Sequence, residues 1–232
     1  MSRYLLFLVA WLPGLALAQS PAEQNVKTKF ERGRLVNGRP KGEWQYFDVD
    51  GKLDLGIDYD SGRITYVRPD SAVHMLRLAD EWVLARPSRP PHLLGSHDRY
   101  ATAICRELRY PIIALRTQTQ GTVRLAFTVT RTGEVTDAQI EATPSRELAQ
   151  EVLRALATQQ DTWLPAVHQD RAHDARLFIL VHFQYQNAFN APKKNHVDLA
   201  HTGITTSTPV TARADEAQQP GRFLELVVQN VR

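Results

Sequence analysis

One group of side chains with metal-binding chemistry stands close together in the sequence. His168, Asp170, His173 and Asp174 fall in a polar stretch between a predicted helix and a predicted strand. In such a stretch a solvated loop is much commoner than a metal site. The sequence also lacks a Gly-x-Ser-x-Gly elbow, a phosphate-cradling glycine loop and a His-Glu-x-x-His helix. We therefore predict no catalytic residues, no metal and no cofactor.

The single cysteine offers little chemistry. Cys105 lies on the apolar side of a helical pattern, so we expect a buried, inert thiol. One cysteine also excludes an internal disulfide. The 232 residues are 43% hydrophobic and 23% charged with a net charge of +3, which is typical of an ordinary soluble protein and not of a nucleic-acid-binding one.

The first eighteen residues have the pattern of an export signal. Arg3 precedes a short apolar run, and Pro13-Gly14 interrupt it before the small-x-small motif Ala16–Ala18. The apolar run is shorter than the ~20 residues that span a bilayer. We predict a signal peptide over 1–18 and an exported protein. The alternative is an uncleaved anchor.

The elements that would position any site are clearest between residues 92 and 187. The pattern predicts helices over 98–108 and 112–117, strands over 123–129 and 135–142 with a bulge near Thr136 or Asp137, a helix after Thr143-Pro144-Ser145, and a strand over 177–185. This order predicts an α+β fold, a small antiparallel three-stranded sheet with helices on one face.

Residues 19–69 show a different pattern. Glycine, a basic residue and an aliphatic residue recur at Gly33, Gly51 and Gly62, and Leu53 to Tyr59 alternate as a strand does. We expect a meander of β-hairpins with one aromatic face. The segment resembles a MORN-type repeat on Gly38, Gly42, Trp44, Tyr46, Asp50, Gly51, Lys52 and Leu53. Such repeats serve as scaffolds or interaction surfaces, and a hairpin platform without a partner is the alternative.

Two further segments complete the predicted domain organisation. Apolar residues at spacings of three and four over 71–85 predict a helix, and Pro87, Pro90 and Pro91 then make a stiff linker, so that 70–91 joins the two halves. Residues 188–232 have no sustained period and predict a flexible tail. Within it, Phe223–Val228 is apolar enough to form a strand that docks on a sheet edge.

The second half resembles the C-terminal domain of the TonB energy-transducer family. The family pattern is matched, in order, by Tyr110, Pro111, Gly121, Val123, Phe127, Val129, Gly133, Val135, Trp163 and Pro165. The resemblance implies a non-catalytic module in the periplasm of a Gram-negative envelope, which binds an extended segment, the TonB box of an outer-membrane receptor, as an added strand.

Mapped onto this chain, the resemblance places the partner at the edge of the last strand. The predicted partner-binding residues are Arg109, Tyr110, Pro111, Leu177, Ile179, Val181, His182, Phe183 and Tyr185. Because exposed edges are usually protected, the tail or a second copy of the domain is an alternative occupant.

Three functions remain open at this stage. The first is a TonB-like periplasmic module that captures a receptor or another envelope protein, with energy coupling uncertain because the long Pro-rich spacer of a transducer is lacking. The second is a non-catalytic envelope scaffold that binds through the MORN-like repeats while the TonB-like domain forms a homodimer. The third is a hydrolase, which no local motif supports.

Overall fold

The computed structural model describes residues 22–159, 162–186, 204–209 and 219–231. The predicted signal peptide over 1–18 lies outside these residues. Among the described residues, no helix is long and apolar enough to cross a membrane.

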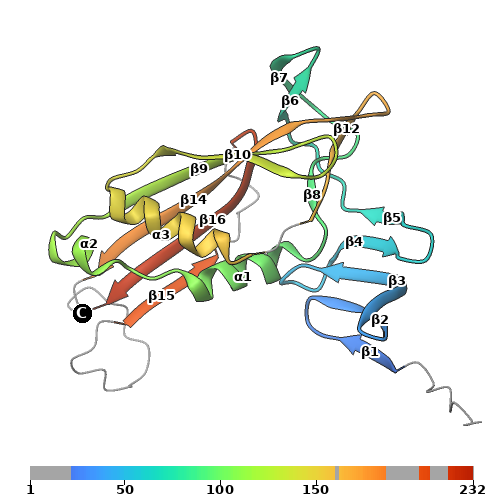
Figure 1. Ribbon diagram of the computed structural model, residues 1–232, viewed down its shortest axis with the longest axis horizontal. Helices are drawn as coiled ribbons and strands as arrows, with labels where there is room; N and C mark the ends of the chain where they lie inside the picture. Colours follow the sequence, from blue (N-terminus) through green and yellow to red (C-terminus); the bar gives the residue numbers. More distant parts are fainter. Residues whose placement is uncertain (1–21, 160–161, 187–203, 210–218, 232) are drawn as a thin grey trace, which may run out of the picture.

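The first half forms an antiparallel five-stranded sheet in sequential order (Figure 1), as the hairpin pattern predicted. Its strands are β1 (Glu23–Lys27), β2 (Glu31–Val36), β3 (Arg39–Phe47), β4 (Leu53–Asp58) and β5 (Arg63–Val67). Trp44, Tyr46, Leu55 and Ile57 form its buried core. Glycine is required at position 33, because a Cβ there would lie 2.2 Å from the Trp44 ring.

The helix predicted over 71–85 is wrong. This segment is a hairpin of β6 (His74–Leu78) and β7 (Glu81–Ala85), turned by Ala79 and Asp80 at φ 47° and 69°. Two successive positive φ angles are the geometry of a two-residue hairpin turn. The apolar residues of this segment fit the strand period as well as the helical one. Packing favours the strand, because Leu76 is buried against Ala166 and Ala175.

The second half is built on a seven-stranded sheet, not on the three strands predicted. Its order is β10-β9-β14-β16-β15, and the β6–β7 hairpin adds at the start of β14. The strands are β9 (Gly121–Val129), β10 (Val135–Ala142), β14 (Ala175–Gln186), β15 (Ile204–Pro209) and β16 (Arg222–Val231). The predicted bulge is present between Thr136 and Gln139, with Asp137 at φ 54°. The extra strands come from segments that sequence reading assigned to a helix and a tail.

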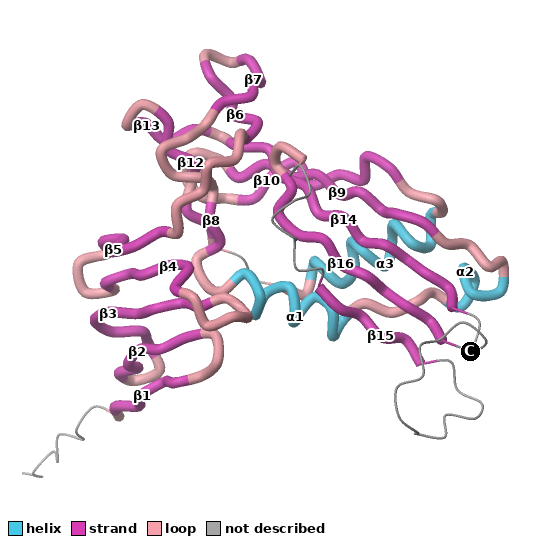
Figure 2. Tube along the Cα trace, turned by 180° about the vertical axis from the view of Figure 1, so that it is seen from behind, coloured by secondary structure: helices cyan, strands magenta, loops and turns pink. Residues whose placement is uncertain are grey.

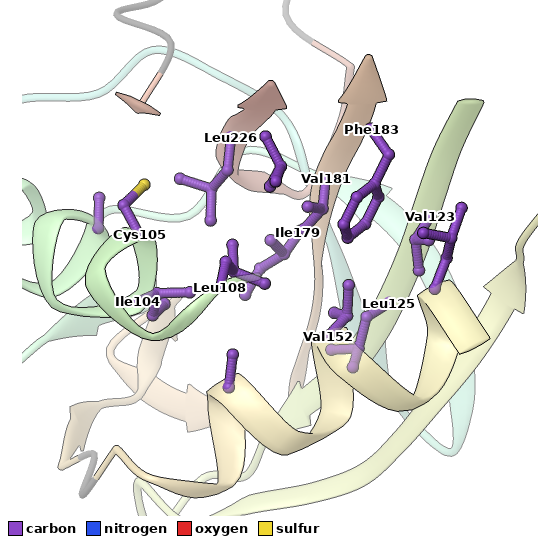
Figure 3. Close-up of a cluster of buried hydrophobic side chains, with 14 of the residues drawn as sticks. Ile104, Cys105, Leu108, Val123, Leu125, Val152, Ile179, Val181, Phe183 and Leu226 are labelled. Carbon is purple, nitrogen blue, oxygen red and sulfur yellow. The ribbon is translucent and has the colours of Figure 1, made fainter. Parts of the chain in front are cut away.

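Helices cover one face of this sheet (Figures 1 and 2). The predicted helices are confirmed as α1 (His97–Glu107), α2 (Ile112–Arg116) and α3 (Arg146–Ala157). Ser96 caps α1 and Ser145 caps α3, each accepting a backbone N–H with its hydroxyl oxygen. Figure 3 shows the resulting core, in which Ile104 of α1, Leu108 directly after α1 and Val152 of α3 meet the inner side chains of the sheet.

Short strands and the proline-rich segment join the two halves. β8 (His92–Leu93) pairs with β11 (Trp163–Leu164), and β12 (Ala166–His168) pairs with β13 (Arg171–His173). The N–H groups of Ser88 and Arg89 donate to the Val167 carbonyl at 2.8 and 3.2 Å. The predicted linker is therefore docked along its length.

Direct contacts also tie the five-stranded sheet to the start of α1. The Ser96 hydroxyl donates to the Phe47 carbonyl at 2.9 Å, and Asp98 accepts the Val49 N–H at 2.6 Å. Arg99 pairs with Glu31 at 2.6 Å. These contacts fix the orientation of the first sheet on the second.

The loop between β9 and β10 depends on Gly133, which has φ 84° and where a Cβ would lie 2.2 Å from the Trp163 carbonyl oxygen. We expect Gly133→Ala to lower the free energy of unfolding by about 2–4 kcal/mol, because it adds backbone strain and a clash with main chain. Chemical denaturation measures this. Gly38→Ala is the matched control, with φ 75° and open space around it, and should cost only the ~1–2 kcal/mol of strain. Equal losses in the two variants would contradict the close approach of Gly133 to Trp163.

Candidate functional site

The candidate site is the edge of β14 that faces away from β9. β14 pairs antiparallel with β9 from Ala175 to Phe183, so this side of the strand is occupied over most of its length. On the other side β16 runs parallel to β14, from Phe178 opposite Arg222 to Gln186 opposite Val231. The strand predicted to receive a partner therefore already has an occupant, which is the C-terminal strand of the same chain.

The apolar predicted site residues belong to the core. Leu177, Ile179, Val181 and Phe183 are buried and point toward the helices, as Figure 3 shows for the last three. Their side chains are thus unavailable to a partner. What β14 offers at this edge is backbone from the residues between them, as where the Phe178 N–H donates to the Gly221 carbonyl at 2.9 Å.

The opposite face of β14 carries the polar group of the site. His182 is partly buried and contacts Thr122 Oγ1 through Nδ1 and Glu225 Oε1 through Nε2, both at 2.8 Å. Because a carboxylate only accepts, Nε2 carries a proton, and in a neutral ring Nδ1 then accepts from Thr122. Arg222 Nη1 donates to the second Glu225 oxygen at 2.8 Å. His182 thus links β9, β14 and β16.

The Arg109–Pro111 segment lies on the helical side of the sheet. Arg109 N–H donates to Glu151 of α3 at 2.7 Å. Tyr110 is buried, donates its hydroxyl proton to the Thr119 carbonyl at 2.7 Å, and packs edge-on against Phe183 at 5.4 Å. Burial raises the pKa of its phenol. Pro111 precedes α2. Among these residues, Tyr110 therefore contacts β14 through Phe183, whereas the Arg109 backbone is bonded to Glu151 of α3. Tyr185 is partly buried near the end of β14.

Sequence reading found β16 as a strand but not its position. Leu226 and Val228 are fully buried beside Val181 and Phe183, and Phe223 lies against Trp163 at 4.6 Å. The sequence signal for this strand was the apolar run Phe223–Val228, in which the buried Leu226 and Val228 are two residues apart. Of the predicted tail, Ile204–Pro209 and Arg222–Val231 form strands, and 188–203 and 210–218 lie outside the described residues.

The groups considered for chemistry have structural roles. His168 Nδ1 and His173 Nδ1 contact the carbonyls of Arg86 and Arg77 at 3.0 and 3.2 Å, and Asp174 accepts the Arg131 N–H at 2.8 Å. Cys105 is buried on α1, where burial raises the pKa of its thiol to about 11. The thiol therefore stays protonated and unreactive at neutral pH.

The link through His182 makes a testable contribution to the seating of β16. We expect His182→Ala to speed tryptic cleavage after Arg222 by about fivefold or more, because Glu225 loses a charge-assisted partner worth roughly 1.5–3 kcal/mol. The matched control is Gln184→Ala, an exposed position on the same strand whose side chain contacts only Gln229 among the bonds described. Equal cleavage rates in the two variants would show that His182 does not hold β16.

Comparison with known protein families finds one match. Residues 106–185 match the family described as Gram-negative bacterial TonB protein C-terminal. A search of curated proteins found no match to this chain. The family match runs from the end of α1 through β14, and therefore includes the candidate edge but neither β16 nor the five-stranded sheet. The resemblance predicted from the sequence is thus confirmed for this domain: residues 106–185 are similar to the C-terminal domain of TonB proteins.

Proposed function

We propose that this protein is a non-catalytic, TonB-like binding module of the periplasm, which captures an extended segment of an outer-membrane receptor or another envelope protein. The segment pairs with the β14 edge by β-strand addition, in energy-coupled transport or as an adaptor. The observation that carries the proposal is the family match over the domain that contains this edge. No metal or cofactor enters the proposed function.

Capture at this edge requires exchange with β16. Releasing β16 gives up its ladder with β14, at ~0.5–1.5 kcal/mol per hydrogen bond, and exposes Leu226 and Val228, at ~1.5–3 kcal/mol each. Parallel pairing is slightly weaker per residue than antiparallel pairing. The exchange is therefore costly, and a partner must restore most of what β16 provides.

The contacts of β16 define the partner segment. Leu224, Leu226 and Val228 lie opposite Ile179, Val181 and Phe183, while Glu225 pairs with His182 on the outer face. A competing segment then needs aliphatic residues at alternate positions facing the helices and an acidic residue within reach of His182. An extended tail of a receptor with this alternation fits the edge.

The five-stranded sheet has a structural role in the proposed function. We infer that this MORN-like region is held rigidly on α1 by Ser96, Asp98 and Arg99 and positions the binding domain in the envelope. The competing scaffold function, with binding through this sheet and a homodimer of the TonB-like domain, predicts partner capture that is independent of the β14 edge.

A reversible lock of β16 on β14 separates these functions. Gln184 and Gln229 are register partners whose side chains contact each other at 3.3 Å on the outer face, so cysteines at both positions should form a disulfide. The oxidised Gln184→Cys/Gln229→Cys variant should crosslink at least about tenfold less envelope protein than the parent chain. Reduction of the disulfide should restore the yield.

The reduced double variant is its own matched control, and buried Cys105 should not interfere. Unchanged capture by the oxidised form would exclude the β14 edge. Loss of that capture on deletion of residues 30–67 would then favour the scaffold function.

A change that weakens β16 should strengthen capture. Gly221 has φ 82°, and a Cβ there would lie 2.8 Å from the Arg176 carbonyl oxygen, at the entry of β16. Gly221→Ala should raise the apparent affinity for envelope partners about 5–30-fold, because the substitution destabilises the docked state of β16 by ~1–2 kcal/mol of backbone strain. Quantitative pull-down measures this, with Gly38→Ala as the control. Lower affinity in folded Gly221→Ala would contradict exchange.

A further inference from the structure

A second cluster of polar side chains lies where the two halves meet. Asp54 of β4, His92 of β8 and His97 at the start of α1 each offer one ligand atom, and these atoms all lie within 4.8 Å of one another. Asp54 and His92 are 6% and 4% exposed. The cluster borders a cavity of about 370 Å³ that is also lined by His74, Arg222 and Phe223.

The proton on His92 is placed by its neighbour. His92 Nδ1 lies 2.7 Å from the Leu93 carbonyl, and a carbonyl only accepts, so Nδ1 carries a proton. In the neutral ring the lone pair is then on Nε2, which faces Asp54 Oδ2 at 3.5 Å and has no hydrogen-bond partner among the described residues. Two electron-rich atoms thus face each other in a buried place, which favours a positive charge between them.

The distances suit a metal ion better than a direct ion pair. A charge-assisted N–H···O bond is about 2.7–2.9 Å long. In a tetrahedral zinc site, with bonds of ~2.0–2.2 Å, neighbouring ligand atoms lie roughly 3.3–3.5 Å apart. Asp54 Oδ2 lies 3.5 Å from His92 Nε2 and 3.7 Å from His97 Nδ1. Both separations are close to the edge of such a tetrahedron.

The surrounding groups hold the three ligands in place. The Asp54 carboxylate divides its oxygens, with Oδ1 3.5 Å from Arg68 Nε and Oδ2 toward the histidines. The charge of Arg68 is shared with Asp48, at 2.8 Å. The two imidazoles stack at 4.3 Å with 25° between their planes, so one ring must turn before both lone pairs point at one ion. Phe223 packs edge-on against His97 at 5.1 Å. The His92 bond to Leu93 is the kind of outer contact that orients a ligating histidine.

We propose that Asp54, His92 and His97 form a binding site for a divalent transition-metal ion, with Zn²⁺ as the best-fitting ion, that joins the five-stranded sheet to the TonB-like domain. Two imidazole nitrogens and one carboxylate oxygen are a ligand set for late first-row metals. The fourth position is left for water. The three ligands lie outside the β14 edge, and β16 touches the site through Phe223, which packs against His97.

Binding at His97 has a defined local cost. Its Nε2 now accepts the Leu93 N–H at 3.3 Å, so Nδ1 carries the proton in the neutral ring. Coordination through Nδ1 moves that proton to Nε2 and breaks the contact with Leu93. That bond is long and weak, whereas metal–ligand bonds contribute far more.

Calorimetric titration of the full chain with Zn²⁺, together with Co²⁺ spectroscopy, tests the site. The site predicts one equivalent bound at micromolar concentration or tighter, a raised Tm, and visible absorption of tetrahedral Co²⁺. Asp54→Asn and His92→Asn should each weaken Zn²⁺ binding by at least about a hundredfold, because loss of even an outer partner costs 10–100-fold. His173→Asn, in the other histidine pair, is the matched control and should bind as the parent does.

Three results would overturn the proposal: no Zn²⁺ bound by the parent chain, unchanged binding in Asp54→Asn and His92→Asn, or loss of binding in His173→Asn alone. If the two ligand variants fail to fold, X-ray absorption of the zinc-loaded parent decides the question. It should show two imidazole ligands with oxygen as the remaining neighbours, and fewer than two imidazoles would contradict the site.

Discussion

The structure depends on the backbone pairing of β14. This strand bonds to β9 on one side and to β16 on the other, and its first residues also pair with β6. Because its inner side chains form the core under α1 and α3, β14 cannot shift register without exposing that core. The side toward β16 is different, since the occupant comes from the far end of the chain and lies outside the family match. An exchangeable strand on a fixed edge is the physical basis of the proposed capture.

The occupant also explains how the domain protects its edge. An unpaired β14 would present a row of N–H and C=O groups to any extended chain, which promotes unwanted association. β16 satisfies these groups, fills the core with Leu226 and Val228, and places Glu225 against His182. In the proposed capture a partner would have to match all three features, and selectivity would follow from the cost of displacing β16.

Local patterns predicted the elements over 98–157 and 175–186 well, but the stretch read as a polar loop contains the short strands β11, β12 and β13. Ser145 capped a helix, the strand alternation over 123–129 was clear, and the out-of-phase Val135 located a bulge. The helix prediction for 71–85 failed because the apolar residues there fit both the helical and the strand period. Strands form because Leu76 packs against Ala166 and Ala175, which are far away in the sequence. The same limit applied to β16, whose pattern showed a strand without showing its neighbour.

The polar sites were harder to predict, for a related reason. Asp54 alternates with aliphatic residues in β4, a pattern that gives no sign of its burial, yet it is buried close to His92 and His97, which come from another part of the chain. Conversely, His168 and His173 are close in sequence but bond to the backbone of other segments. Proximity in sequence was thus a poor guide to which side chains meet.

Amide hydrogen exchange of the chain with and without a captured envelope partner tests the central claim most directly. The account predicts that residues 222–231 lose their protection in the complex, while β9 and β14 keep theirs because the partner replaces β16 at the same edge. Full protection of residues 222–231 in the complex would show that β16 stays in place, and would contradict capture by strand exchange.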